Sequence, residues 1–262
     1  MVFAVVFMGV FCEQLAPHDP LEVDLSKKFL PPSAEYPLGT DSMGRGMLSR
    51  IMYGIRISLK TGLTVLAIAM PLGILVGAVA GYVSPAIDNL IMRVTDIFLA
   101  FPAYVLAMAI GAALGASLMH AMLAVATVWW PSYARLVRGQ VLSIKQNVYI
   151  EAARGIGATE GRILFRHVLP NCLSPILVLA SMDVGVTILA TAALSFIGLG
   201  AQAPTPELGS MIASGRIYLI DYPWITTAPG VTIFVTVLGL NLLGDNLRDF
   251  LDPQLRGLRV RE

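Results

Sequence analysis

One acidic residue stands at a depth where a charge is costly. Asp183 lies near the middle of the apolar stretch LVLASMDVGVTILA, and an acid at the centre of a membrane helix costs about 2.5–3.5 kcal/mol on insertion scales. Such residues face a bundle interior or a watery path. Asp183 therefore either lines a path, with Asn241 as a second candidate, or forms a structural hydrogen bond to a neighbouring helix or a partner subunit. Both interpretations stay open on the sequence.

The other reactive side chains do not form a recognisable catalytic pattern. His18, His120 and His167 are far apart and form no HExxH pair. The chain also has no nucleotide-binding loop of the form GxxxxGK(S/T). We therefore expect no catalytic residue, no metal site and no cofactor in this chain, and we expect any energy source to lie in a different protein.

A basic, glycine-rich block, EAARGIGATEGRILFRHVLPN, occupies residues 151–171 between two apolar runs. Gly155 and Gly157 disfavour a continuous helix, because glycine costs about 1 kcal/mol relative to alanine in a helix interior. Thr159 can cap a second short helix over 160–168. Pro170 would then permit a sharp return into the next apolar run. The pattern predicts a helix, a glycine turn and a second helix.

The elements that position these residues are long and apolar. The chain is 56% hydrophobic and only 13% charged, whereas soluble domains have about 25% charged residues. Six apolar runs predict an all-α transmembrane fold, because lipid offers no partner to backbone groups outside helices and closed barrels. The runs are 1–16, 57–83, 97–116, 118–137, 173–199 and 229–250. The first is short for the roughly 20 residues that a span needs, which suggests a truncated or misassigned start.

Lysine and arginine predict the orientation of this single membrane domain, residues 1–262. They are more numerous in segments 84–96, 138–172 and 251–262 than in the alternate segments, which places those three in the cytoplasm. Two extracytoplasmic segments follow, 17–56 and 200–228. From Asp41 the first of them has apolar residues at helical spacing, which predicts an interfacial helix.

The block at 151–171 resembles a known motif. Glu151, Ala152, Ala153 and Gly157, followed by LP at 169–170, fall on the positions of the EAA motif of binding-protein-dependent ABC importer permeases, with His167 in place of the consensus isoleucine. The segments PLGTDSMGRGMLSR, TVWWPSYARLVRGQVLSIK, LSFIGLG, PTPELG and LLGDNLRDFLDPQL are similar to the dipeptide, oligopeptide and nickel branch of that family. The resemblance covers about residues 15–257.

This resemblance implies a permease subunit of the bacterial inner membrane, not an enzyme. It implies partners: a second homologous permease, two cytoplasmic ATPase subunits that bind ATP and Mg, and an extracytoplasmic solute-binding protein. The block would be a coupling helix seated on an ATPase. Its expected contact residues are Glu151, Ala152, Ala153, Gly157, Arg162, Phe165, Arg166 and Pro170.

Three cargo and energy hypotheses remain on the sequence. The first is ATP-driven import of di- or oligopeptides. The second keeps the family and changes the cargo to nickel or a nickel chelate, with Asp183 as a ligand on the path. The third belongs to another class, a secondary transporter driven by protons through Asp183.

Overall fold

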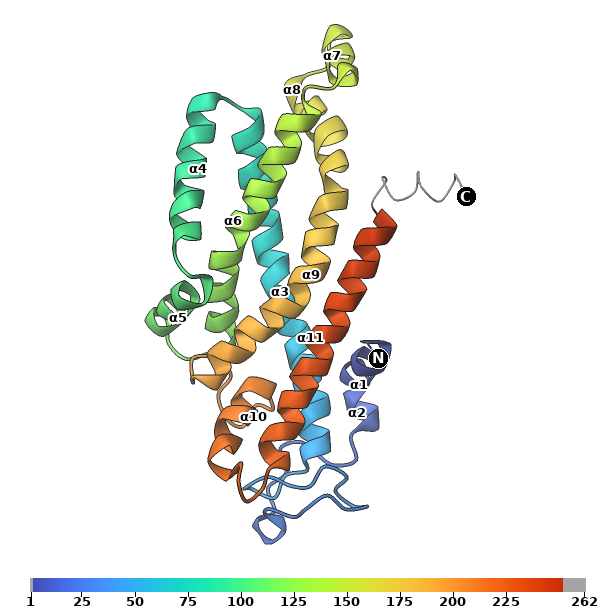
Figure 1. The fold of residues 1–262 in the computed structure, drawn as a ribbon, viewed down its shortest axis with the longest axis vertical. Coiled ribbons are helices and arrows are strands. Elements are labelled where there is room, and N and C mark those ends of the chain that lie inside the picture. Colours follow the sequence, from blue (N-terminus) through green and yellow to red (C-terminus); the bar gives the residue numbers. More distant parts are fainter. Residues whose placement is uncertain (1, 252–262) are drawn as a thin grey trace.

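The structure is a computed structural model that describes residues 2–251. The expected cytoplasmic segment 251–262 lies almost wholly outside the described residues. Within them the fold is helical, with one isolated bridge between Thr40 and Gly46 (Figure 1). The main helices are α1 (Val2–Val10), α2 (Cys12–Leu15), α3 (Met47–Tyr82), α4 (Pro85–Ala100), α5 (Ala103–Leu114), α6 (Leu118–Ile144), α7 (Val148–Gly155), α8 (Glu160–Ile163), α9 (Leu169–Phe196), α10 (Leu208–Gly215) and α11 (Trp224–Leu251).

Helices α3 and α6 form the centre of the bundle through close backbone approach. Gly73, Gly77 and Gly81 repeat every fourth residue on α3. A Cβ atom at Gly77 would lie 2.3 Å from the carbonyl oxygen of Ala134 on α6. At Gly73 it would lie 2.4 Å from the Cβ atom of Tyr133. Small residues at this spacing let two membrane helices pack backbone against backbone, so these glycines fix how closely α3 and α6 approach.

The predicted interfacial helix after Asp41 is wrong. Residues 47–59 are the first turns of α3, which continues without a break to Tyr82. The apolar spacing is real, but Met47, Ile51 and Ile55 are buried in a protein core. These side chains contact neighbouring helices instead of lying in the membrane interface.

The expected third span is bent. Helix α4 occupies residues expected to form the first cytoplasmic segment, and it meets α5 at an angle of 91°. Phe101 at the corner is extended, with φ −87° and ψ 143°, as expected for a residue that precedes a proline. At the other end of α4, the Ser84 side chain accepts a hydrogen bond from the Ile87 amide. Local capping and Pro102 therefore explain both ends of this helix.

Three stretches of the described chain are long and apolar enough to cross a membrane: Met47–Tyr82, Glu160–Phe196 and Trp224–Asp249. A fourth is added if the bent pair α4 and α5 counts as one span. The all-α membrane class is thus confirmed, with three or four candidate spans in the described residues.

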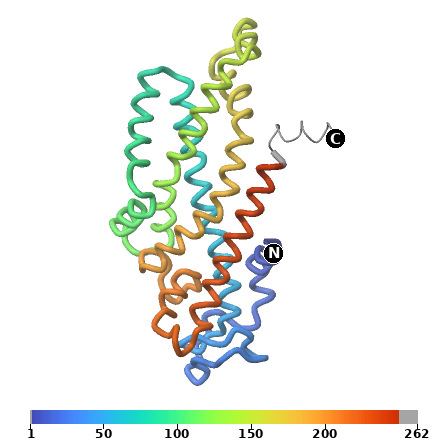
Figure 2. The backbone as a smooth tube through the Cα atoms, viewed as in Figure 1, coloured from blue at the N-terminus to red at the C-terminus, as the bar shows by residue number. Residues whose placement is uncertain are grey.

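The two ends of the bundle differ. Helices α7 and α8 project beyond one end of α6 and α9, whereas α10 and the loop before α3 cover the opposite end (Figure 1). The backbone trace shows the same separation, with the green-yellow turn at the top and the blue loop at the bottom (Figure 2). The motif residues and the segments 17–56 and 200–228 therefore lie at opposite ends of the molecule (Figure 1).

Candidate partner-binding site at the α7–α8 end

We name residues 148–168 the elbow. It begins where α6 ends, and Lys145 fixes this junction because its Nζ atom donates a 2.8 Å hydrogen bond to the carbonyl oxygen of Gly81. The end of α6 is thereby tied to the end of α3. The elbow starts from a fixed point on the central helix pair.

Helix α7 has one buried face and one exposed face. Ile150 is fully buried, and Ala153 is nearly so, in a cluster with residues of α3, α6 and α9. Glu151 and Ala152 are exposed on the other side. Val148 is also 79% exposed. Two residues of the EAA triplet, Glu151 and Ala152, thus face outward, and the third, Ala153, packs into the buried cluster.

A glycine turn follows α7, as predicted. Gly157 has φ +85°, a left-handed conformation that side-chain-bearing residues adopt only with strain. Its amide donates to the Arg154 carbonyl oxygen at 2.9 Å, and the Ala158 amide donates to the Ala153 carbonyl oxygen at 3.1 Å. The predicted cap is also present, because the Thr159 side chain accepts from the Arg162 amide.

The second half of the elbow differs from the prediction. A π-helical turn, η2 (Leu164–Val168), joins α8 directly to α9, and residues 160–196 form one continuous helical stretch. Pro170 lies in the first turn of α9, directly after this π-helical turn. The expected sharp return at Pro170 is therefore wrong, and the elbow is rigidly continuous with α9.

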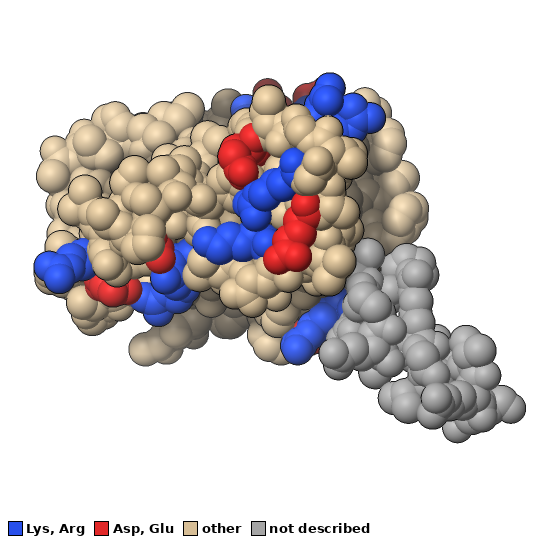
Figure 3. Space-filling view, turned by 90° about the horizontal axis from the view of Figure 1, so that it is seen from above, with Lys and Arg blue, Asp and Glu red and all other residues tan. Residues whose placement is uncertain are grey.

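Polar contacts connect the two halves of the elbow to each other and to α3. Arg154 Nε lies 3.0 Å from the Glu160 carboxylate. The Tyr82 hydroxyl donates to that carboxylate and, at 3.1 Å, to the Glu160 carbonyl oxygen. The hydrogen bond that Arg154 donates to the Glu160 carboxylate raises the pKa of Arg154 above its usual value. Charged side chains of both signs interleave on this end of the molecule (Figure 3).

The exposed surface of the elbow combines apolar and basic groups. Ile156 is 88% exposed at the glycine turn, and Phe165 is 66% exposed on η2. Ile156 borders a groove of about 350 Å³, which is lined by Ala153, Ile156, Gly157, Ala158, Arg162, Arg166 and His167. Large exposed apolar residues rimmed by polar groups are typical of a protein interaction surface.

The structure brings together most of the predicted coupling residues. Ala153, Gly157, Arg162 and Arg166 line the groove, while Phe165 lies exposed on the same elbow. Pro170 is exposed beyond the elbow, on α9. Ile156 and Tyr82 were not predicted. Ile156 is an apolar residue between two glycines of a polar turn, and this pattern could have indicated an exposed contact residue. The contact of Tyr82 with Glu160 spans 78 residues, so no local sequence pattern indicates it.

The two predicted path residues lie in the helical interior but contact different helices. Asp183 accepts a 2.8 Å hydrogen bond from the Tyr133 hydroxyl on α6. The side-chain oxygen of Asn241 is buried and has no hydrogen-bond partner among the described residues; it lies against Gly185 on α9. The sequence left two roles open for Asp183, a place on the path and a structural hydrogen bond to a neighbouring helix. The hydrogen bond from Tyr133 is a contact of the second type.

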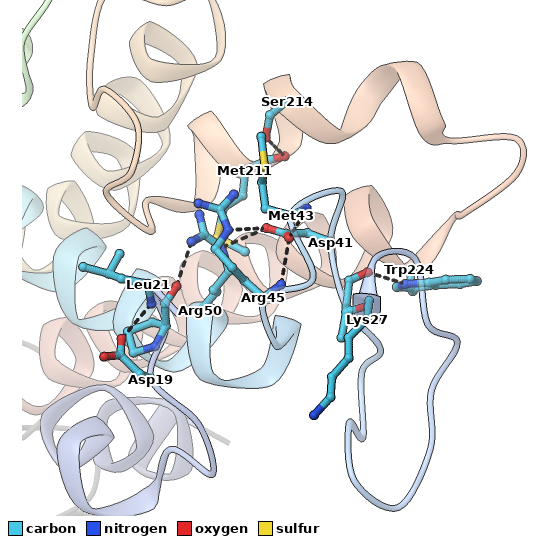
Figure 4. A network of polar contacts seen from close by, with 12 residues as sticks. Asp19, Leu21, Lys27, Asp41, Met43, Arg45, Arg50, Met211, Ser214 and Trp224 are labelled. Carbon is cyan, nitrogen blue, oxygen red and sulfur yellow. Dashed lines mark hydrogen bonds and ion pairs between the residues drawn. The ribbon is translucent and has the colours of Figure 1, made fainter. Parts of the chain in front are cut away.

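At the opposite end of the molecule, the Asp41 carboxylate organises the loop before α3. Asp41 accepts hydrogen bonds from the Met43 amide at 2.8 Å and from the Arg45 amide at 3.0 Å. Arg45 Nε lies 2.7 Å from the same carboxylate, and Arg50 Nε lies 3.6 Å from it (Figure 4). In addition, Trp224 donates to the Thr40 carbonyl oxygen at 3.2 Å. The outer loop is thus fixed to both α3 and α11.

These features define a class: a helical membrane protein with an elbow that exposes apolar and basic side chains at one end and a folded loop layer at the other. Residues 73–257 match the family described as "Binding-protein-dependent transport system inner membrane component". The chain belongs to this family. It is therefore a permease subunit of the inner membrane, and its family works with ATPase subunits and a solute-binding protein.

Similar proteins extend over almost the whole chain. The probable D,D-dipeptide transport system permease protein DdpC of Escherichia coli K12 is 46% identical, covering 98% of this chain and 86% of that protein. The dipeptide transport system permease protein DppC of Alkalihalophilus pseudofirmus is 43% identical, covering 98% and 84%. The glutathione transport system permease protein GsiD of Pectobacterium atrosepticum is 43% identical, covering 97% and 85%.

Solved structures share the fold at low identity. A chain of the inward-facing MetNI methionine ABC transporter matches with a TM-score of 0.61 and 21% identity, covering 79% of this chain and 98% of that chain. A chain of an amino acid ABC transporter with histidines matches with a TM-score of 0.55 and 18% identity, covering 76% and 92%. These likenesses support the arrangement of the helices.

Proposed function

We propose that this chain is a six-span permease subunit of an ATP-driven importer of di- or oligopeptides. Two of the relatives at 43–46% identity are named for dipeptides and one for glutathione, itself a short peptide. Besides the spans already described, α1 and α6 would supply the remaining two. A second homologous permease would complete the pathway.

The observation that carries the coupling role is the exposed apolar and basic surface of the elbow. Ile156 and Phe165 are largely exposed on the elbow, and Arg162 and Arg166 line the groove that Ile156 borders. A short helical element with such a surface fits a groove on another protein. We place this surface on a cytoplasmic ATPase.

The same geometry supports a mechanism. Ile150 and Ile163 anchor the two halves of the elbow in one buried cluster with α6 and α9, and Tyr82 and Lys145 tie it to the end of α3. Closure of the ATPase pair on ATP would displace the elbow. Because the elbow continues into α9 without a break, that displacement would tilt α9 and the α3–α6 pair and change the exposure of the pathway.

The outer layer would receive the loaded solute-binding protein. Segments 17–56 and 200–228 meet at this end through the contact between Trp224 and Thr40, and they lie opposite the elbow (Figure 1). Docking and ATP-driven movement would thus act at opposite ends of the same helices.

Uptake measurements in a strain that lacks this gene test the cargo. We expect labelled dialanine to enter only when the wild-type chain is restored, and labelled nickel ion to enter equally with and without it. Nickel uptake that depends on the chain, without dipeptide uptake, would instead establish the nickel alternative. Among the described residues no three His, Cys, Asp or Glu side chains gather as a metal site.

The proton-driven alternative is a different class of transporter. Membership of a binding-protein-dependent family argues against it. Uptake that survives depletion of ATP but ceases when the proton gradient is collapsed would contradict our proposal, whereas the reverse dependence is expected.

A further inference from the structure

The outer end of the bundle contains a cavity with an excess of positive charge. The start of α3, the end of α9, the loop after it and α10 surround a volume of about 410 Å³, within the range of about 300–1,000 Å³ typical of small-molecule sites. Among the described residues that line it are three arginines, Arg45, Arg50 and Arg216, and no acid.

The nearby carboxylate does not balance these arginines. Asp41 lies beside two of them but does not line the cavity. Arg45 uses Nε on Asp41, and among the described residues its two terminal amino groups have no hydrogen-bond partner. Arg216 forms no ion pair within the described chain and lies over the Phe196 ring, 5.8 Å from its centroid. Glu207 is buried behind the wall and also does not line the cavity, and its carboxylate accepts hydrogen bonds from the Gly209 and Ser210 amides. Among the described residues, Asp41 is thus the one carboxylate that forms ion pairs with the arginines of the cavity, and it pairs with two of the three.

The arginines next to Asp41 are recessed. The side chains of Arg45 and Arg50 are only 15% and 6% exposed, and Arg50 is held by a 2.9 Å hydrogen bond to the Pro20 carbonyl oxygen. Burying a charge is costly unless it is paired. Fixed, largely desolvated guanidinium groups with unused donors are therefore prepared to receive an anion.

The remaining walls limit what that anion can be. Ser210 and Ser214 supply hydroxyl groups, and Phe196, Ile197 and Met211 supply apolar surface. A guanidinium group binds a carboxylate through two parallel hydrogen bonds. The cavity suits a small molecule that carries one carboxylate and modest apolar groups.

We infer that this cavity binds the terminal carboxylate of a short peptide on its way into the pathway. The inference rests on the proposed peptide cargo and adds a recognition site to it. A carboxylate on the surface of a docked protein fits less well, because the guanidinium groups of Arg45 and Arg50 are recessed and only that of Arg216 is exposed. The site would retain peptides with a free carboxyl end after they leave the binding protein.

Equilibrium binding to the complete importer without its binding protein tests the site. The probes are radiolabelled dialanine and the C-terminal amide of the same dipeptide. We expect the free acid to bind at least tenfold more tightly than the amide. Arg216→Gln should remove most of that preference, whereas Arg216→Lys, which keeps the charge but loses the planar fork, should retain part of it. Lys28→Gln removes an exposed outer charge away from the cavity and should change nothing.

Several results would overturn the inference. Equal binding of acid and amide, no measurable binding of dialanine, or an unchanged preference in Arg216→Gln would each reject the site. If Arg216→Gln instead weakens stimulation of the ATPase by the binding protein and leaves the preference intact, the carboxylate belongs to the binding protein. Uptake of dialanine by cells, measured in parallel, separates the hypotheses: uptake without acid preference rejects only the cavity, and absence of uptake rejects the peptide cargo.

Discussion

Among the residues of the elbow, Gly157 is the one whose conformation depends on having no side chain. Its φ of +85° is open to other residues only at a cost of about 1–2 kcal/mol, although a Cβ atom there would meet nothing within 4 Å. Gly155 has equal space and no positive φ. A side chain at Gly157 would therefore add backbone strain without crowding, whereas a side chain at Gly155 would add neither.

We expect Gly157→Val to reduce peptide uptake roughly tenfold or more, since 1.4 kcal/mol corresponds to a factor of ten and the turn holds the partner surface. The solute-binding protein should still bind its ligand. Gly155→Ala is the matched control and should transport normally.

Replacing the exposed Glu151 with tryptophan should also abolish uptake by blocking the partner. Normal uptake in Gly157→Val and in the Glu151 variant would refute the coupling role.

Asp183 allows a second test at the residue scale. Asp183→Asn keeps an oxygen that can accept the hydrogen bond from Tyr133 but removes the negative charge. If Asp183 lines the path, uptake should fall several-fold while the complex still assembles. Tyr133→Phe is the control that removes the hydrogen bond and keeps the charge. Failure of both variants to assemble would establish a structural role instead.

At the scale of elements, the contact between α3 and α6 depends on small residues. A Cβ atom at Gly77 would lie 2.3 Å from a backbone oxygen of α6, which cannot move aside as a side-chain end could. Gly77→Ala should therefore lower the stability of the assembled complex, by about 1–3 kcal/mol as for other overpacked cores. Gly139→Ala on α6 has open space and serves as the control. The measurement is the thermal midpoint of the purified complex, and equal midpoints would show that this contact is not tight.

Local sequence signals predicted the elements of the elbow but not their continuity. Thr159 and Gly157 act within one turn, so their residue types were sufficient. Pro170 was misleading, because proline is compatible both with a break and with the first turn of a helix. The start of α3 was assigned to the interface because its apolar residues recur at helical spacing with Arg45 and Arg50 off that stripe. Arg50 bonds to Pro20 and Arg56 to Glu13, which are distant partners that the spacing could not indicate.

At the scale of the whole molecule, the all-helical membrane class followed from composition. The outer cavity did not, because its arginines come from residues 45, 50 and 216 and meet only after folding. The orientation from lysine and arginine stays a prediction, and it can be tested on intact cells.

The two native cysteines are buried, so single cysteines can report the orientation. Ile156 and Ile220 are 88% and 94% exposed at opposite ends. With a membrane-impermeant maleimide, Ile220→Cys should react in intact cells, whereas Ile156→Cys should react only after the cells are opened. The unmodified chain is the control. Reaction of Ile156→Cys in intact cells would reverse the orientation.

Helix α3 runs without interruption from the loop that holds Asp41 to the tyrosine that holds the elbow. At 1.5 Å per residue its 36 residues extend about 54 Å, and one rod thus joins the surface proposed for the solute receptor to the surface proposed for the motor. Coupling between two sites is reciprocal in binding free energy. If nucleotide binding to the motor raises the affinity for the receptor by some factor, receptor docking must raise the affinity for nucleotide by the same factor. In an importer built on this rod, a motor that favours receptor docking when it holds nucleotide would therefore also hold nucleotide more tightly once a receptor has docked.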